Sequence, residues 1–265
     1  MCLCTVLTRC NDEYLTDISN LKLLDDDFSN IIFEDQDCLE LLLETVLNRK
    51  IDIIEYHTQH SIKNLFGRSI RIDIFAKTRE GHLINIEIQN DDAGASPKRA
   101  RYHGSLIDTK ESFKSEKWSE IPKMIVIFIT KNDVLGKNKP IYHMQRVSKE
   151  TQDVFKDEEE IIYVNASIQD DTPLGRLMHD FQCTKVEDMY YEVLRERVRY
   201  FKENEEGVRK MCQIMEDIEK RGVIKTKVND IKMLMINCNF TLEKALNALG
   251  VPFDEREMYI KKLAM

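Results

Sequence analysis

Residues 70–89, IRIDIFAKTREGHLINIEIQ, contain the pattern that decides the fold. Isoleucines alternate with other side chains from Ile70 to Ile74 and again from Ile84 to Ile88, on both sides of a short segment that contains a glycine. Period-two alternation on either side of such a turn is typical of a β-hairpin. We therefore predict two antiparallel strands whose isoleucine side chains face the core.

Polar side chains occupy the other face of this predicted hairpin. Glu87 and Gln89 are two residues apart and must share one face of their strand, and Asp73 takes a non-isoleucine position of the partner strand. Asp73 and Glu87, with the backbone carbonyl of Ile88, offer the oxygen ligands that Mg²⁺ prefers. Such a cation polarises a phosphodiester and lowers the pKa of an attacking water, which Gln89 can orient through hydrogen bonds.

The segments that flank the hairpin predict an α/β architecture. Residues 37–48 carry apolar side chains at helical spacing, and either Asp35 or Asp37 can cap the start of this helix. Residues 97–114 also predict a helix, which begins with a proline at a position where proline is tolerated. The continuous apolar run at residues 123–130 predicts a strand buried in the centre of the sheet.

One further short strand is expected at residues 161–165, and the chain from Thr172 onward has a helical pattern. Gly222 is expected to break this helical region. Residues 224–265 predict a small helical module that lacks the basic recognition helix of a DNA-reading unit, so we interpret it as a packing or interaction module. The fold class is thus α/β, with a mixed central sheet flanked by helices and a helical C-terminal extension.

Charge and hydropathy limit the classes of protein to which the chain can belong. A net charge of −8 argues against a protein that coats DNA, but residues 97–149 are rich in lysine and arginine. An enzyme that touches phosphate over a small footprint needs only such a local basic patch. No apolar run reaches the roughly 18 residues that span a bilayer, and no signal peptide is evident, so we expect a cytoplasmic protein without membrane association.

Cysteine and histidine positions predict no zinc site. None of the seven cysteines forms a C-x-x-C pair, and we find no histidine with a cysteine or an acid at ligand spacing. His103 is the histidine nearest the predicted carboxylate pair. It suits either a proton shuttle or a structural histidine, and we favour the structural role.

The order of motifs resembles the PD-(D/E)XK family transposases, also called recombination-promoting nucleases. Asp73, Glu87 and Gln89 match the family's Asp…Glu-x-Gln pattern, which has glutamine where the wider superfamily has lysine. Residues 97–103, PKRARYH, resemble the family's next helix, with His103 in place of a second tyrosine. The resemblance covers most of residues 24–220 and extends to three more segments, which are Asp26-Asp27-Phe28, the leucine-rich helix after Cys38, and Leu174–Phe181.

The resemblance implies a restriction-endonuclease-like fold and the site residues of a DNA endonuclease that depends on Mg²⁺, with Mn²⁺ as the alternative metal. The superfamily places a further acid on its first helix, for which Glu40 is the candidate and Glu44 the alternative. Arg99 and Tyr102 would share a helix face beside the site, where Arg99 suits a phosphate. Lys98 is a third candidate for substrate binding, although a solvated surface lysine is the interpretation we favour for it.

The expected substrate is DNA, cut with little sequence preference during recombination or mobile-element movement. Two other classes fit the sequence, namely a catalytically weak nuclease relative that acts as a DNA-binding or protein-interaction module, and a metal-free helical scaffold. A homodimer through the C-terminal helices is expected of the scaffold and is compatible with the nuclease. The predicted divisions are an N-terminal segment at 1–23, a nuclease-like core at 24–182, a long helical region at 183–222 and a small helical C-terminal module at 223–265.

Overall fold

The computed structural model describes residues 12–64, 67–91, 94–112, 115 and 117–263. The contacts within the chain divide it into two compact units. One unit is Ser19–Lys202, and the other combines Met1–Ile18 with Glu203–Met265. The boundary therefore falls inside the region that the sequence predicts as long and helical, and the first eleven residues of the predicted N-terminal segment lie outside the described residues.

The first unit contains all the strands together with helices, and helices alone follow it. In chain order the elements are α1 (Asp12–Asn20), α2 (Asp26–Ile32), α3 (Gln36–Leu47), β1 (Ile53–Ile62), β2 (Ile70–Thr78), β3 (Leu83–Gln89), α4 (Pro97–Glu111), η4 (Trp118–Glu120), β4 (Met124–Thr130), β5 (Ile141–Met144), β6 (Glu159–Asn165), α5 (Pro173–Gln182), η5 (Val186–Asp188), α6 (Glu192–Glu203), α7 (Glu205–Asn237), α8 (Leu242–Ala248) and α9 (Arg256–Leu263).

The strands form one mixed sheet in the order β1-β2-β3-β4-β6-β5. Strands β1, β2 and β3 pair antiparallel, as do β5 and β6. Strands β3, β4 and β6 pair parallel, and α4 supplies the crossover that parallel β3 and β4 require. The prediction of an α/β fold with a mixed central sheet is therefore confirmed.

The predicted hairpin and the predicted central strand are both present. Ile74 of β2 lies opposite Ile86 of β3, and Ala76 lies opposite Ile84. Every residue of β4 is buried, as the apolar run at 123–130 predicts, because β4 lies between two strands and both of its faces are covered.

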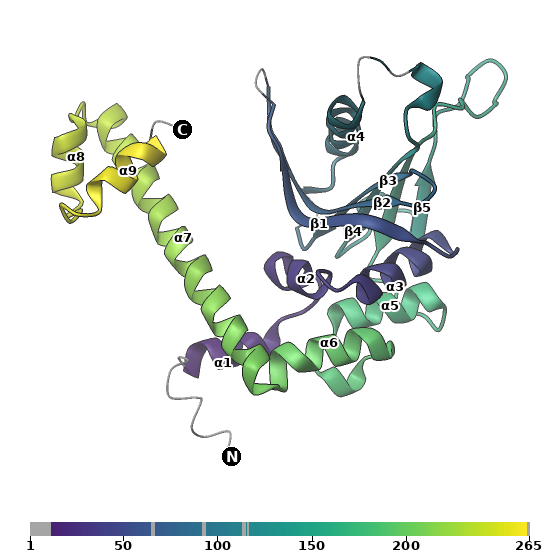
Figure 1. Cartoon of the computed structure of the whole chain (residues 1–265), viewed down its shortest axis with the longest axis horizontal. Coiled ribbons are helices and arrows are strands. Elements are labelled where there is room, and N and C mark those ends of the chain that lie inside the picture. The colour runs from purple at the N-terminus through teal and green to yellow at the C-terminus, as the bar shows by residue number, and fades with distance from the viewer. Residues whose placement is uncertain (1–11, 65–66, 92–93, 113–114, 116, 264–265) are drawn as a thin grey trace. The chain divides into compact units, whose positions relative to one another are not determined.

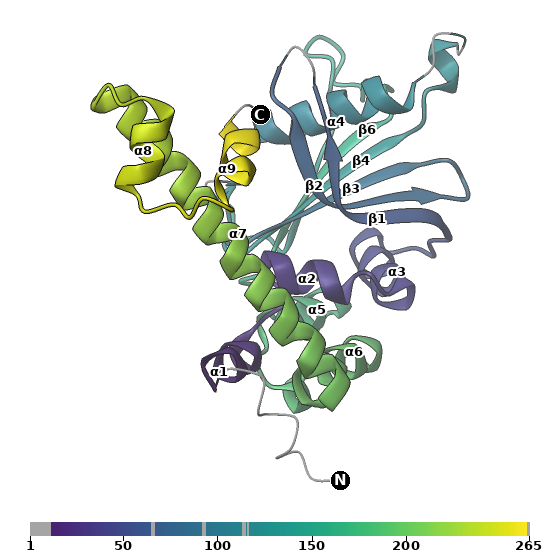
Figure 2. The same cartoon turned by 60° about the vertical axis from the view of Figure 1, so that its left-hand side comes forward.

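Helices cover both faces of the sheet. Helix α4 packs on one face against β4, and α2 lies on the other face across β1, β2 and β3, beside α3 and α5 (Figure 1). A second view shows the same two layers (Figure 2). The apolar cluster beneath α4 includes Ala100, Ile107 and Phe128. This packing holds about two turns of α4 against the centre of the sheet.

Side-chain caps explain where the flanking helices begin. The Asp35 side chain accepts a hydrogen bond from the Cys38 backbone N–H, which confirms Asp35 as the cap of α3. Ser96 accepts from the Arg99 backbone N–H at the start of α4, and Pro97 takes the first helical position. The entry into α4, which directly follows β3, is therefore well defined.

The C-terminal helices have a small core of their own. Apolar side chains from α7, α8 and the segments that follow pack together, namely Ile231, Ala245, Leu246, Val251 and Tyr259. The predicted break at Gly222 is wrong, because α7 continues without interruption from Glu205 to Asn237. One glycine costs a helix only about 1 kcal/mol, which strong helix formers on either side can offset. Over the described residues, no helix is both long enough and apolar enough to cross a membrane.

Candidate active site

The three polar residues of the hairpin lie together on the central strands β2 and β3. Glu87 is completely buried, and Asp73 is 8% exposed. Gln89, at the end of β3, is half-buried. Because β2 and β3 pair with Ile74 opposite Ile86, Asp73 comes directly beside Glu87. The predicted juxtaposition of these side chains is therefore observed, inside the protein rather than on its surface.

Arg99 of α4 joins the two β3 side chains. One guanidinium nitrogen of Arg99 donates to Glu87 Oε2 at 2.7 Å, and another donates to Gln89 Oε1 at 3.0 Å and to the Gly94 carbonyl at 2.9 Å. Arg99 Nε also donates to His103 Nε2 at 3.3 Å. A fixed fork of donors suits these acceptors, which diverge in direction. In this state Arg99 balances the buried charge of Glu87.

His103 completes the contacts of Glu87. Arg99 Nε donates to Nε2 of this ring, and the other ring nitrogen, Nδ1, lies 3.2 Å from the side-chain amide nitrogen of Asn85. Nδ1 lies 3.2 Å from Glu87 Oε1, yet this oxygen accepts no hydrogen bond from the described residues. His103 is 2% exposed, which fits the structural role that we favour from the sequence. Glu87 Oε1 is a buried acceptor that a bound cation would satisfy.

The surroundings of Asp73 favour its neutral, protonated form. Burial is the largest cause that raises the pKa of Asp73 to about 8, and the negative charges of Glu87 and Asp26 raise it further. The Ile88 backbone N–H, which donates to Asp73 Oδ2 at 2.8 Å, and Arg99 act in the opposite direction. Asp73 and Glu87 are neighbouring buried carboxylates whose negative charges are not fully compensated, as expected where a divalent cation binds.

The donor set fits a hard cation that retains water. Asp73 and Glu87 contribute carboxylates, while the Ile88 carbonyl accepts from Gln89 Nε2 at 3.1 Å and must lose that bond to serve as a ligand. Among the described residues, Asp73 and Glu87 have no third acid, histidine or cysteine whose ligand atom lies within 4.8 Å of theirs. Mg²⁺ commonly binds through one or two carboxylates and keeps several waters, so two carboxylates suffice.

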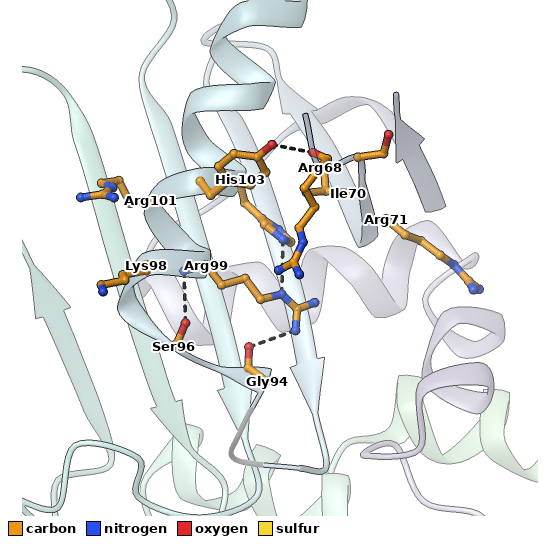
Figure 3. A pocket seen from close by; sticks show the side chains of 11 residues that line it. Arg68, Ile70, Arg71, Gly94, Ser96, Lys98, Arg99, Arg101 and His103 are labelled. Atoms are coloured by element: carbon orange, nitrogen blue, oxygen red, sulfur yellow. Dashed lines mark hydrogen bonds between the residues drawn. The ribbon is translucent and has the colours of Figure 1, made fainter. Parts of the chain in front are cut away.

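An open cleft of about 860 Å³ adjoins the carboxylates. Arginine and lysine side chains line it, and the described lining contains no acid; the cationic residues are Arg68, Arg71, Lys98, Arg99 and Arg101. Figure 3 shows Arg99 pointing into the space between α4 and the strands, where it contacts His103 and Gly94. Arg99 and His103 belong both to the cleft and to the surroundings of Glu87, so the cleft leads to the buried carboxylates.

The predicted substrate-binding residues occupy different positions around this cleft. Arg99 reaches Glu87, whereas Lys98 and Arg101 are exposed and point away from Arg99 in Figure 3. The Tyr102 hydroxyl donates to the Arg68 carbonyl at 2.5 Å and accepts from Asn64 Nδ2 at 3.3 Å. Tyr102 thus fixes the segment that carries Arg68, a cleft residue that the sequence reasoning missed.

The predicted helix acid is not part of this cluster. Glu40 lies on α3, where it accepts a hydrogen bond from Gln36, and none of its contacts with the described residues involves Asp73 or Glu87. Asp26, at the start of α2, is the helix acid whose charge acts on Asp73. Asp26 belongs to the Asp26-Asp27-Phe28 segment that the resemblance highlights, but no sequence periodicity places this segment beside β2.

Comparison with known proteins supports the reading of this geometry. A family model described as "PD-(D/E)XK nuclease family transposase" matches residues 28–174, more than half of the chain. No curated protein and no solved structure matches the chain. The matched range contains β2, β3 and α4, and with them Asp73, Glu87, Gln89 and Arg99.

Proposed function

The chain belongs to the PD-(D/E)XK nuclease family transposases, and from this premise we propose that it is a metal-dependent endonuclease that hydrolyses phosphodiester bonds in DNA. The family supports a nuclease-type function, and its superfamily generally uses divalent metal ions. The observation that carries the proposal is the buried pair Asp73 and Glu87, next to a cleft lined by cations that shares Arg99 and His103 with the surroundings of Glu87. A role in recombination or mobile-element movement is part of the same proposal.

Asp73 and Glu87 would hold Mg²⁺ or Mn²⁺, with the Ile88 carbonyl as a third ligand. A bound divalent cation supplies a Lewis acid for the scissile phosphate and an acidified water. The protein's own groups do the rest. Arginines of the cleft attract and orient the phosphate backbone, and Gln89, whose amide both donates and accepts, positions the water. The buried location of Glu87 keeps bulk water away from its carboxylate.

Arg99 links substrate binding to this site. Its guanidinium contacts Glu87 and also lines the cleft, so a phosphate that enters the cleft meets the same cation that balances the carboxylate. Arg99 can therefore turn from Glu87 toward a phosphate once another cation balances the carboxylate. Lys98 and Arg101 would contact the phosphate backbone farther from the reacting group, where binding depends on salt.

Cleavage of supercoiled plasmid tests the proposal. Purified protein should nick or linearise the plasmid with Mg²⁺ or Mn²⁺, and EDTA should abolish cleavage. Asp73→Ala should lower the rate about a hundredfold or more, since loss of a metal ligand removes several kcal/mol of transition-state stabilisation. Asp52→Ala is the matched control, because Asp52 is exposed and pairs with Arg79 outside the cleft. Equal activity of wild type and Asp73→Ala would refute the site assignment.

A catalytically weak relative that binds DNA or protein is the second candidate. The net charge of −8 and the glutamine at position 89 favour it. Gln89→Lys separates the two functions, because a lysine supplies the positive charge used in the wider superfamily. An enzyme should keep or increase its cleavage rate in this variant, whereas an inert binding protein should show no cleavage with either residue.

Two accompanying proposals concern assembly and location. A homodimer is proposed from the helical C-terminal region, and light scattering after size-exclusion chromatography should give twice the 31.2 kDa mass of the chain. A cytoplasmic location, the expectation from the sequence, is also part of the proposal, and cell fractionation checks it. Either could fail without affecting the nuclease assignment.

A further inference from the structure

A histidine, an aspartate and a cysteine meet at the end of α5, on a helix that contributes nothing to the carboxylate site. His179 Nδ1 lies 3.3 Å from Cys183 Sγ and 3.5 Å from Asp180 Oδ1. One ligand atom from each of the three residues falls within 4.8 Å of the others, and no other set among the described residues meets this condition. The expectation that no histidine has a cysteine at ligand spacing is therefore wrong here.

The helix itself explains half of this convergence. His179 and Cys183 are four residues apart, so they lie one above the other on the same face of the α5 terminus. His179 is partly exposed, and Cys183 is a free thiol of intermediate burial. Both can therefore be reached from solvent by a metal ion.

Asp180 is fixed by a segment that follows α5. Its two carboxylate oxygens accept hydrogen bonds from the backbone N–H groups of Tyr190, at 2.7 Å, and Tyr191, at 2.9 Å. Asp180 is completely buried, and the His179 ring lies edge-on against Tyr190 at 4.9 Å. Hydrogen bonds and packing of this kind hold metal ligands in their binding orientation.

We propose that His179, Asp180 and Cys183 form a binding site for Zn²⁺ or a chemically similar borderline divalent ion, separate from the proposed nuclease site. Imidazole, thiolate and carboxylate together are a typical donor set for zinc, in contrast to the all-oxygen set at Asp73 and Glu87. With Zn–S near 2.3 Å and Zn–N near 2.0 Å, tetrahedral geometry separates sulfur and nitrogen by about 3.5 Å. The observed 3.3 Å is close to this separation.

The three protein ligands leave a fourth tetrahedral position for water. Binding replaces waters of the hydrated ion by the imidazole nitrogen, one carboxylate oxygen and the sulfur, and the Cys183 S–H proton passes to solvent as the sulfur–metal bond forms. No redox change is involved. The ion would link the end of α5 to Tyr190 and Tyr191 through Asp180, which predicts a structural effect as well as binding.

Cobalt binding to the full-length protein tests the site directly. EDTA-stripped protein that carries Asp73→Ala, which removes a ligand of the proposed nuclease site, is titrated with Co²⁺ under reducing conditions. Thiolate-to-cobalt charge-transfer absorption should saturate at one equivalent, and Zn²⁺ should displace the cobalt. Cys183→Ser should lose this absorption, and His179→Gln should weaken binding. Asp180→Asn is avoided because Asp180 also supports the Tyr190 backbone.

Cys238→Ser is the matched control, because Cys238 is an exposed free cysteine far from His179 in sequence, and it should leave the absorption unchanged. Zn²⁺ should raise the unfolding temperature of the stripped protein but not that of Cys183→Ser, and circular dichroism without metal shows whether each variant folds. Absence of the absorption in the parent protein, or its persistence in a folded Cys183→Ser variant, would overturn the proposal. Plasmid cleavage is not a readout, so failure here leaves the nuclease proposal unaffected.

Discussion

Arg99 compensates the most deeply buried charge of the candidate active site. Glu87 has no exposed surface, and Arg99 supplies its closest positive charge at 2.7 Å. The same guanidinium binds Gln89 and the Gly94 carbonyl, and a lysine ammonium could not match this planar fork. The stability of the metal-free protein should therefore depend on the pairing between Arg99 and Glu87.

A double-mutant cycle measures this pairing. Arg99→Ala should lower the free energy of unfolding by about 3 kcal/mol, because it leaves Glu87 buried without a partner. Adding Glu87→Gln should restore most of the loss, since the remaining group is then neutral. Urea denaturation with EDTA at pH 8 gives both values. Arg79→Ala, at an exposed pair, is the control and should leave the free energy of unfolding nearly unchanged. Additive losses in the double variant would contradict the pairing.

The titration of Asp73 makes stability depend on pH. Its pKa rises from 3.8 to about 8 on folding, so between these values the folded protein binds a proton that the unfolded chain has lost. The free energy of unfolding of the metal-free protein should therefore fall as pH rises from about 4 to about 8. Asp73→Asn should lack this contribution, and its stability relative to wild type should increase across the same window.

Urea denaturation in EDTA at several pH values between 4 and 9 compares Asp73→Asn with wild type. The exposed Asp52→Asn substitution controls for the loss of one negative charge. If the difference between Asp73→Asn and wild type stays constant over the window, Asp73 titrates with a normal pKa in the folded protein, and its proposed electrostatic surroundings are wrong.

The glycine at position 94, between β3 and α4, leaves room for the end of the Gln89 side chain. A Cβ added to Gly94 would overlap Gln89 Oε1 and lie 3.1 Å from an Arg99 guanidinium nitrogen. Gly94→Ala should therefore displace the Gln89 side chain and reduce cleavage about tenfold or more, as small misplacements of catalytic groups do. Gly222→Ala is the control, because a Cβ there contacts nothing within 4 Å, and it should leave cleavage unchanged.

The identity of the helix acid can be decided between α2 and α3. Asp26 acts electrostatically on Asp73, whereas Glu40 hydrogen-bonds Gln36 on its own helix. Asp26→Asn should therefore change the rate and the pH profile of plasmid cleavage, and Glu40→Gln should change neither. The opposite result would favour Glu40, the candidate predicted from the sequence.

All residues of the proposed nuclease site belong to the unit Ser19–Lys202. The C-terminal helices bury their own apolar cluster, in which Tyr259 is 1% exposed. Tyr259→Ala in the full chain should destabilise this cluster by about 3–5 kcal/mol, the usual cost of removing a large buried aromatic side chain. Plasmid cleavage should persist, because the cluster contributes no site residue.

Hydrogen exchange of Tyr259→Ala locates the loss of stability. Amides of α8 and α9 should exchange faster, while those of β3 and β4 keep their protection. Phe253→Ala serves as the control, since Phe253 is 85% exposed. Loss of cleavage by a Tyr259→Ala protein whose β4 remains protected would show that the C-terminal helices take part in the reaction.

The sequence by itself determined the two strands of the central hairpin and the polar side chains that they carry. Period-two isoleucines fix which face of β2 and β3 carries Asp73, Glu87 and Gln89, because alternation along a strand is a local geometric property. Caps are local as well, and Asp35 was predictable for that reason. The spacing of His179 and Cys183 was equally available, since four residues form one helical turn, but our sequence interpretation overlooked it.

Only the tertiary structure decided which side chains from separate elements meet. The contact of Arg99 with Glu87 depends on how α4 packs against β4, and the approach of Asp26 to Asp73 depends on how α2 covers the opposite face. No periodicity within one segment contains this information. Likewise, Asp180 is fixed by backbone amides ten and eleven residues later, through a chain path that follows from packing rather than from local spacing.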